Sequence, residues 1–240
     1  MIKVVSFKIC PFVQRVTALL EAKNTPYDIQ YIDLSHKPDW FLKVSPNGQV
    51  PLLITESGEV LFESDAIVEY IEEITSNPLF NPNPVQKAQE RAWSYLATKH
   101  YLAQCSAQRS KDKQTLLERA DKLSKAFTKL EEKLTGSQFF SGDSISMVYI
   151  AWLPLLHRAS IIENYSGYDF ISQFPKVKSL QQHILETDLA KKSVATDFED
   201  RFTAFYLSDK TYLGQCTQAK REGACLGESE CKDEDFECCA

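Results

Sequence analysis

Cys10 is the side chain of this 240-residue chain whose type and position best fit a chemical role. It stands in Cys10-Pro11-Phe12-Val13, where a β-rich run from Lys3 ends and a helical pattern begins. The unpaired N–H groups and the positive dipole end at a helix N-terminus stabilise a thiolate and lower a cysteine pKa below about 8.5. Because the thiolate is the reactive form, we predict that Cys10 is a nucleophile.

Val13 stands where a Cys-x-x-Cys motif would carry its second cysteine, so the motif holds no resolving thiol. A mixed disulfide at Cys10 must then be released by a thiol of another molecule, for which glutathione is the obvious cytosolic candidate. The alternative is that Cys10 is a small buried hydrophobic residue. Arg15 could add positive potential near the thiol, but we expect it to be a solvated surface charge.

Short β-rich runs that alternate with helical ones predict the elements that hold Cys10. Strands are expected at residues 3–7, 27–33, 50–55 and 59–62. Helices are expected at residues 11–23, at 38–44 and from Asp65 onward, with Ser64 as the N-cap of the last one. The resulting order βαβαββα matches an α/β thioredoxin-like fold.

Composition divides the chain into four parts. Residues 77–84 hold three prolines and three asparagines, which break helices and mark a boundary between domains. The helical patterns after this boundary lie at residues 86–109, 115–134, 146–160, 175–185 and 189–207. We therefore predict a thioredoxin-like domain at 1–76, a linker at 77–84, an all-α domain at 85–213 and a tail at 214–240.

The predicted tail is rich in cysteine and acidic residues. Five of the seven cysteines lie in it, namely Cys216, Cys225, Cys231, Cys238 and Cys239. Their spacing does not follow the paired pattern of structural zinc sites, although loose binding of a soft metal or a redox role stays open. Few apolar side chains remain there to bury, so we expect the tail to be disordered and its thiols to be reduced.

Composition and charge indicate a globular protein and argue against binding to nucleic acid. Hydrophobic residues make up 43% and charged residues 25% of the chain, as in a soluble globular protein. The formal net charge of −6 and the lack of a basic stripe argue against a nucleic-acid partner. No apolar run reaches the length of a membrane span, and the N-terminus does not read as a signal peptide. With only Cys10 and Cys105 outside the tail, we expect a reducing, cytoplasmic location.

Several motifs in one order resemble the omega-class glutathione transferases. They are Cys10-Pro11-Phe12, Lys37-Pro38-Asp39-Trp40-Phe41, Val50-Pro51-Leu52-Leu53, Phe62-Glu63-Ser64, Phe127-Thr128-Lys129-Leu130-Glu131 and Ser144-Ile145-Ser146-Met147. The resemblance extends to about residue 207. It implies a homodimer that uses glutathione as a co-substrate without a metal, and an all-α domain that lines the second substrate's pocket.

The resemblance also implies roles for residues near Cys10. The bond between Val50 and Pro51 is expected to be cis, so that the backbone of Val50 pairs with the cysteinyl part of glutathione; an ordinary trans proline at a strand start is the alternative. Phe12 is expected to shield the thiol and to line the substrate mouth. On residue type alone, Phe12 would instead be assigned to the core.

Further positions are implied to bind the two charged ends of glutathione. Ser64 and the helix N-terminus are expected to hold the γ-glutamyl carboxylate, with Glu63 paired to the α-ammonium. Lys37 is expected to pair with the glycine carboxylate. Without the resemblance, Ser64 would be a plain helix cap, and Glu63 and Lys37 would be ordinary surface charges.

Three functions stay open. The first is a glutathione-dependent thiol transferase, in which a second glutathione resolves the mixed disulfide at Cys10; the resemblance implies that it is also a dehydroascorbate reductase. The second is a conjugating transferase, which would need a hydroxyl near the glutathione sulfur; Ser6 is the nearest one and lies too early in the chain. The third is a non-catalytic relative, since chloride intracellular channel proteins and bacterial stringent-starvation regulators share the Cys-Pro-Phe start.

Overall fold

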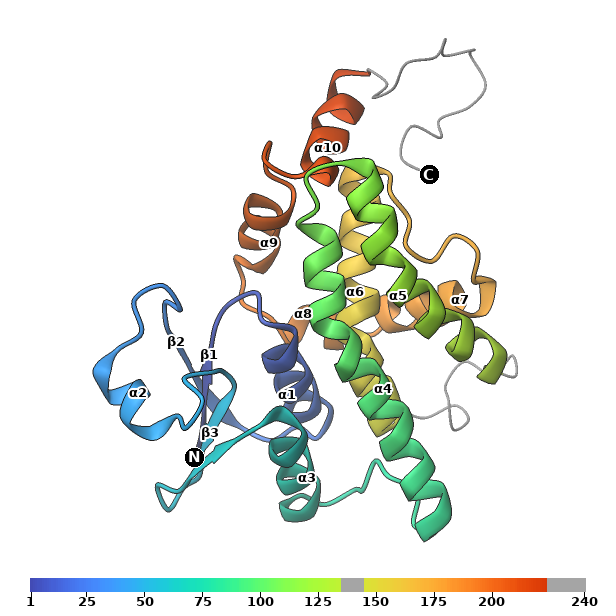
Figure 1. The fold of residues 1–240 in the computed structure, drawn as a ribbon. Coiled ribbons are helices and arrows are strands. Elements are labelled where there is room, and N and C mark those ends of the chain that lie inside the picture. The colour runs from blue at the N-terminus through green and yellow to red at the C-terminus, as the bar shows by residue number, and fades with distance from the viewer. Residues whose placement is uncertain (135–144, 224–240) are drawn as a thin grey trace. The chain divides into compact units, whose positions relative to one another are not determined.

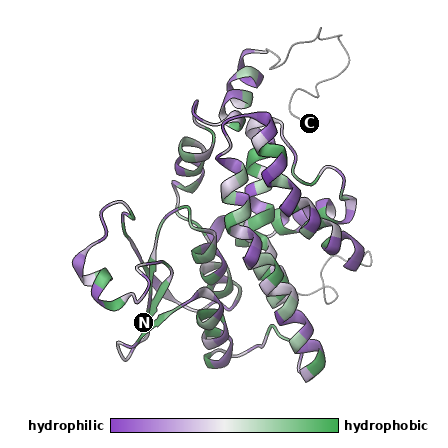
Figure 2. Cartoon of the chain, in the orientation of Figure 1, coloured by the Kyte–Doolittle hydropathy of each residue, from purple (hydrophilic) through white to green (hydrophobic). Residues whose placement is uncertain are grey.

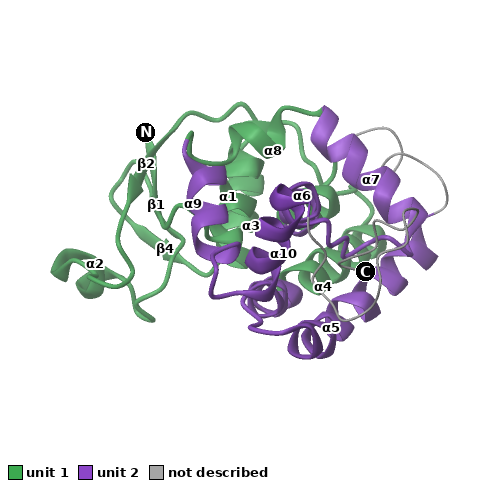
Figure 3. Ribbon diagram, turned by 90° about the horizontal axis from the view of Figure 1, so that it is seen from above, with its two compact units in different colours: residues 1–98, 139–154, 187–196 green, residues 99–138, 155–186, 197–240 purple. Residues whose placement is uncertain are grey.

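The computed structural model of the chain describes residues 1–134 and 145–223 (Figure 1). The described residues form two compact units (Figure 3). The first unit takes residues 1–98, 145–154 and 187–196, and the second takes 99–134, 155–186 and 197–223. Helices α4 (Pro84–Gln108) and α6 (Met147–Ser166) contribute residues to both units. The linker and the domain boundaries expected from composition stay predictions.

The first unit holds a four-stranded mixed sheet with the strand order β2-β1-β3-β4. Its strands are β1 (Ile2–Ser6), β2 (Tyr27–Tyr31), β3 (Leu52–Ile54) and β4 (Val60–Phe62). The helices that alternate with them are α1 (Pro11–Ala22), α2 (Asp39–Val44) and α3 (Ser64–Ile74). The predicted order βαβαββα and the thioredoxin-like fold are thus confirmed.

The strand directions bring four chain segments to one edge of this sheet. β1 pairs in parallel with β2, with Ser6 opposite Tyr31, and antiparallel with β3, with Val5 opposite Leu52. β3 pairs antiparallel with β4, with Leu52 opposite Phe62. The C-terminal ends of β1, β2 and β4 therefore share an edge with the start of β3. Because α1 and α3 follow β1 and β4, both helices begin at this edge.

Buried apolar residues fix the sheet and its helices. Val5, Ile32, Phe41 and Leu52 form one cluster, which joins α2 to β1 and β3. α1 and α3 pack against each other, and α1 is buried at every position from Val13 to Leu20. Pro11 stands at the first position of α1, where its missing N–H would have no partner in the helix.

The start of α3 differs by one residue from the prediction. Ser64 is the first residue of the helix, and Glu63 takes the N-cap position that was expected for Ser64. The backbone of Glu63 is left-handed, with φ 65°, and its carbonyl accepts the N–H of Ile67 at 3.0 Å. This turn follows directly on β4, and it is a backbone conformation that the residue type Glu does not signal.

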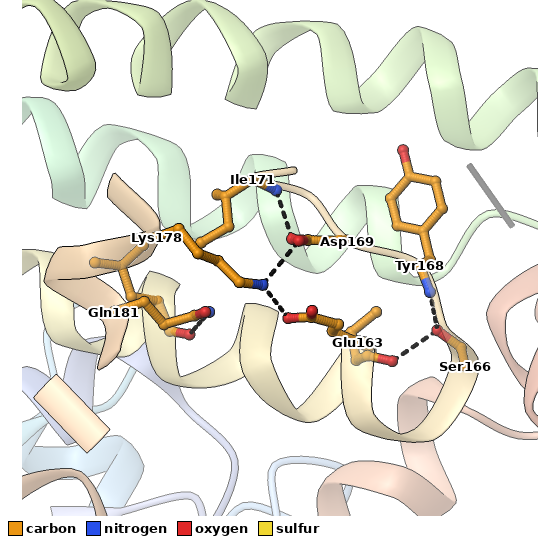
Figure 4. Close-up of polar contacts among 9 residues, drawn as sticks. Glu163, Ser166, Tyr168, Asp169, Ile171, Lys178 and Gln181 are labelled. Atoms are coloured by element: carbon orange, nitrogen blue, oxygen red, sulfur yellow. Dashed lines mark hydrogen bonds and ion pairs between the residues drawn. The ribbon is translucent and has the colours of Figure 1, made fainter. Parts of the chain in front are cut away.

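The remaining helices of the described chain are α5 (Lys113–Lys133), α7 (Pro175–Glu186), α8 (Leu189–Lys192), α9 (Phe198–Tyr206) and α10 (Tyr212–Glu222). In the second unit α5 packs against α7. Lys178 of α7 contacts both Glu163 at the end of α6 and Asp169, whose Oδ2 is 2.8 Å from the Lys178 Nζ (Figure 4). This network fastens the segment between α6 and α7.

The single helix expected at residues 189–207 is wrong, because the chain breaks between α8 and α9. The Ser193 carbonyl accepts the hydroxyl of Thr17 at 2.6 Å. In a continuous helix that carbonyl would accept the N–H of residue 197. A side chain 176 positions away therefore takes the place of the helical bond.

The expectation of disorder from residue 214 is wrong for residues 214–222, which belong to α10. Thr211 caps this helix by accepting the N–H of Gly214 at 3.1 Å, and the N–H of Tyr212 donates to the Ser110 carbonyl at 2.8 Å. Leu213, Cys216 and Ala219 are buried at a spacing of three. The rest of the tail, with its four other cysteines, lies outside the described residues.

α6 is buried at every position from Met147 to Leu156, and Figure 2 shows this helix rich in hydrophobic residues. The Ser146 hydroxyl accepts the N–H of Tyr149 at 3.3 Å, as a capping serine does. In a capping box, an acidic side chain at the position of Tyr149 would accept the backbone N–H of the capping serine. Tyr149 has no carboxylate, and its hydroxyl contacts that of Thr187 at 3.0 Å. Neither α6 nor any other described helix is long and apolar enough to cross a membrane.

Candidate functional site

Cys10 lies at the sheet edge where β1 gives way to α1. Its N–H donates to the Phe7 carbonyl at 3.0 Å and closes a tight turn, while its carbonyl accepts the N–H of Gln14 at 3.1 Å. The backbone at Cys10 is extended, so it is the N-cap residue of α1. The side chain is half-buried. The predicted position at the start of a helix is confirmed, and the first-turn N–H groups lie next to the thiol.

The two residues that follow Pro11 differ in exposure. Phe12 is half-buried on the first turn of α1, whereas the Val13 side chain is 3% exposed. Val13 therefore belongs to the core, and Phe12 keeps an aromatic surface beside the Cys10 backbone. This arrangement is compatible with the shielding role predicted for Phe12.

Val50 and Pro51 precede β3 at the same edge, and the bond between them is cis, as expected. Leu52 opposes Val5, so Pro51 lies near the end of β1. The ladder of β3 begins only at Leu52, which leaves the backbone of Val50 outside the sheet pairing. Val50 packs against the apolar cluster around Phe41. Its peptide groups are thus placed for a strand-like contact with a ligand.

Glu63 and Ser64 mark the start of α3 at this edge. Ser64 is 6% exposed, and Glu63 is exposed. The Glu63 Oε1 accepts a hydrogen bond from the Asn47 Nδ2 at 3.0 Å. The first N–H groups of α3 have no acceptor within the helix, and with the dipole they form an environment suited to a carboxylate.

Lys37 borders the turn that leads to Val50. Its Nζ lies 3.6 Å from the place that a Cβ on Gly48 would take, and Gly48 has φ 58°. Ser45 closes the turn, because its hydroxyl accepts the N–H of Gln49 at 3.0 Å. Since Asn47 of the same turn contacts Glu63, the structure gathers Lys37 and Glu63 around one loop.

The chain before Lys37 is ordered by Asp33. The hydroxyl of Ser35 donates to the Asp33 carboxylate at 2.6 Å and the Ser35 N–H donates at 2.8 Å. These two bonds, with a weaker contribution from His36 at 3.2 Å, lower the pKa of Asp33 to about 2. The loop after β2 therefore has a local hydrogen-bonded shape just ahead of Lys37.

The expectation that Arg15 is a solvated charge is wrong. Its side chain is 1% exposed, and its Nη1 forms an ion pair with the Asp65 Oδ1 in the first turn of α3. Sequence reasoning missed Asp65 as well, since only packing of α1 against α3 joins the two residues. In the sequence, the apolar Val13 and Val16 on either side of Arg15 are the one local sign that this stretch of the helix is buried.

Lys8 is a second cationic residue at the edge. It follows β1 and its Nζ lies 5.3 Å from the centre of the Tyr31 ring, at the end of β2. This cation–π contact holds the turn before Cys10 against the neighbouring strand. Among residues 1–134 and 145–223, no three His, Cys, Asp or Glu side chains gather as a metal site.

Comparisons with known proteins agree with this geometry. The family model described as "Glutathione S-transferase, N-terminal domain" matches residues 9–74, and "Glutathione S-transferase, C-terminal domain" matches residues 70–188. Glutathione S-transferase omega-1 of Rattus norvegicus is 32% identical over 214 residues, which cover 87% of each chain. A probable cytosolic glutathione S-transferase DHAR1 of Oryza sativa is 31% identical, covering 78% of this chain and 84% of the relative.

Solved structures show the same fold. Glutathione transferase Omega 3C from Trametes versicolor superposes with a TM-score of 0.70 at 22% identity, covering 81% of this chain and 89% of that one. The likeness takes in both the mixed sheet and the helices that follow it.

Proposed function

We propose, from the premise that this chain belongs to the glutathione S-transferase family, that it is a glutathione-dependent thiol transferase with Cys10 as its nucleophile. The observation that carries the proposal is the place of Cys10, half-buried at the N-cap of α1 on the edge where α3 and Val50 also lie. A helix start favours the thiolate form. The similarity to omega-class relatives supports this role.

The reaction exchanges disulfides in two balanced steps. The Cys10 thiolate attacks the glutathione sulfur of a mixed disulfide; the new bond joins Cys10 to glutathione, and the other half leaves as a thiolate that takes up a proton. A second glutathione, as its thiolate, then attacks the bound glutathione sulfur. Oxidised glutathione leaves and the Cys10 thiolate returns. Because Val13 is not a cysteine, this second molecule is required for turnover.

Dehydroascorbate is the second acceptor that we propose. It would take up two electrons and two protons from two glutathione molecules, which leave as one disulfide. Support comes from rice relatives named as probable DHAR glutathione transferases, at 31% and 32% identity. Here the Cys10 thiolate would add to a carbonyl carbon of dehydroascorbate, and a first glutathione would attack the Cys10 sulfur, so that ascorbate leaves with the electron pair and takes up protons. The second glutathione then resolves the Cys10–glutathione disulfide, as it does for the other acceptor.

We assign the seven predicted site residues to one extended glutathione. Ser64 and the start of α3 would take the γ-glutamyl carboxylate, with Glu63 beside them. The Val50 backbone, set by Pro51, would pair with the cysteinyl part, and Lys37 would meet the glycine carboxylate. Phe12 would cover the thiol. Residues from all four strand ends contribute to this arrangement.

The structure offers little for conjugation by a hydroxyl group. Ser6 is 2% exposed and its hydroxyl donates to the Phe7 carbonyl at 3.3 Å. It is therefore engaged within the protein, and Cys10 is the better candidate to meet the glutathione sulfur. A homodimer, a cytoplasmic location and a metal-free site stay predictions.

Peptide mass spectrometry after exposure to oxidised glutathione tests the proposal. We expect one glutathione adduct of the unsubstituted chain on Cys10, and loss of thiol transfer and dehydroascorbate reduction in Cys10→Ser. Cys105→Ser is the matched control and should keep both activities. Modification confined to the tail cysteines, or full activity of Cys10→Ser, contradicts the proposed mechanism. A chain that neither binds glutathione nor forms the adduct would favour the non-catalytic alternative.

A further inference from the structure

Helix α8 packs against α1 within the first unit, although it comes late in the chain; both helices are green in Figure 3. The Thr17 hydroxyl of α1 donates to the Ser193 carbonyl at 2.6 Å, across 176 positions of the chain. The Gln14 side-chain amide donates to the Ala190 carbonyl at 3.4 Å and to the Ser193 hydroxyl at 3.3 Å. A segment distant in sequence therefore holds two successive turns of α1.

These hydrogen bonds are shielded from water. Gln14, Thr17 and Ser193 are 2%, 1% and 4% exposed. Because a buried polar group that loses its partner costs free energy, each bond restricts where α8 can lie against α1. The Ser193 hydroxyl also donates to the Ala190 carbonyl at 3.1 Å, so it joins the Gln14 amide to the backbone of α8. The contact between the two helices thus has a defined geometry.

Gln14 connects this contact to the candidate nucleophile. Its backbone N–H donates to the Cys10 carbonyl at 3.1 Å, which closes the first turn of α1, while its side chain is held by α8. Helix ends fray, and the N–H groups that stabilise a thiolate belong to the first turn. A residue that closes this turn and is anchored outside the helix therefore keeps the turn in place beside the thiol.

We propose that α8 holds the first turn of α1 in the conformation that makes Cys10 reactive, with Gln14, Thr17 and Ser193 as positioning residues. This inference rests on the proposed function and adds a source for the reactivity of its nucleophile. None of the three residues is assigned a contact with glutathione. Each acts through the backbone of α1, and the start of that helix acts on the thiol.

The break between α8 and α9 fits this role. In a helix that continued past Ser193, the Ser193 carbonyl would accept the N–H of residue 197. Because α8 ends at Lys192, that carbonyl is available to the Thr17 hydroxyl. The end of α8 therefore supplies the acceptor that α1 uses, which gives the interrupted helix a function in the site.

The rate at which iodoacetamide alkylates Cys10, followed by peptide mass spectrometry between about pH 5 and pH 9, tests the proposal in the full-length protein. Thr17→Val keeps the shape of the side chain and removes the hydroxyl that donates to Ser193. It should raise the midpoint of the pH profile by about half a unit and slow alkylation below that midpoint roughly two- to threefold, the size of a helix-end effect on a charge. Lys8 and Arg15 are unchanged, so a shift cannot come from altered charge.

Three further variants test whether the hydroxyl and its partner are responsible. Ser193→Ala removes the side-chain acceptor of the Gln14 amide and should shift the midpoint in the same direction by less. Thr17→Ser retains a hydroxyl and should keep the profile of the unsubstituted chain. Thr217→Val is the matched control, because Thr217 is 5% exposed and its hydroxyl donates to the Leu213 carbonyl at 2.8 Å within α10. That variant should leave the profile unchanged.

The outcomes separate this inference from the proposed function. An unchanged midpoint in both Thr17→Val and Ser193→Ala overturns it, even if both variants unfold more easily, because α8 would then add stability alone. An equal shift in Thr17→Ser or Thr217→Val overturns it as well. If Thr17→Val does not fold, the midpoint of Ser193→Ala decides. Alkylation needs no glutathione, so failure of the unsubstituted chain to form the glutathione adduct contradicts the proposed reaction independently of these profiles.

Discussion

Lys23 and Glu72 form a buried ion pair in the first unit, with the Lys23 Nζ 2.5 Å from the Glu72 Oε2 and side chains 1% and 4% exposed. The other Glu72 oxygen accepts the backbone N–H groups of Leu79 and Phe80 at 2.6 and 3.0 Å. Lys23 also donates to the Asn77 carbonyl at 2.9 Å. The pair therefore fastens the segment after α3 to the end of α1.

Glu72→Gln should lower the free energy of unfolding by about 3 kcal/mol or more, because it leaves the Lys23 ammonium buried without its counter-charge. Urea unfolding followed by circular dichroism measures the change. Asp121→Asn is the control: its pair with Lys125 also spans 2.5 Å but is 56% and 71% exposed, so the expected change is below about 1 kcal/mol. Similar losses in the two variants would show that burial does not decide the strength of the pair.

The three described cysteines should differ in reactivity. At pH 7 we expect iodoacetamide to modify Cys10 first, because it is half-buried at a helix start, and Cys216 last, because it is 2% exposed. Cys105 is half-buried in the last turn of α4, away from any helix start, and should be intermediate. Timed alkylation with peptide mass spectrometry gives the order, and denaturation in urea should abolish it. Faster alkylation of Cys105 than of Cys10 would argue against an activated thiol.

Asp33 should titrate near pH 2. Since its pKa in the folded state is lowered from an ordinary value of about 3.9, its contribution to stability is present above about pH 4 and is lost as pH falls through about 2. Carboxyl NMR across this range measures the midpoint. Ser35→Ala should raise that midpoint more than His36→Ala, because it removes the Ser35 hydroxyl bond, the largest cause of the lowered pKa, while the backbone N–H of residue 35 still donates. An unchanged midpoint in Ser35→Ala would mean that another group lowers the pKa.

Lys37→Met should weaken the binding of glutathione by about tenfold, since it removes the cation that we assign to the glycine carboxylate. The same variant should bind the glycine ethyl ester of glutathione as the unsubstituted protein does. Lys43→Met in α2 is the matched control, because it removes the same charge at the last turn of that helix. If Lys37→Met weakens the ester equally, Lys37 does not contact this carboxylate.

Local pattern was enough to predict the framework of the first unit. Short stretches of sequence indicate three of its features: the strand that ends before Cys10, the proline at the start of α1, and the hairpin of β3 and β4. Each of these features is governed by the residues beside it in sequence. The place of Cys10 at a helix start could be predicted for that reason, and the cis bond before Pro51 was expected from the family resemblance.

Contacts between residues far apart in the chain determine the features that local sequence patterns did not predict. The break after α8 depends on the Thr17 hydroxyl, and α10 depends on a buried face that starts at Tyr212. The turn at Glu63 is a backbone conformation that its residue type does not encode. Local composition describes none of these, because each depends on a group that the fold brings near.

The sequence by itself placed Cys10 between a strand and a helix start, where a thiol is reactive. It also showed that the motif holds no second thiol to resolve a mixed disulfide at Cys10. Only the tertiary structure paired Arg15 with Asp65, across 50 positions of the chain. An arginine in a helix reads as a surface charge until packing places it in the interior. Once water is excluded there, the charge must have a counter-charge, and the packing of α1 against α3 supplies one.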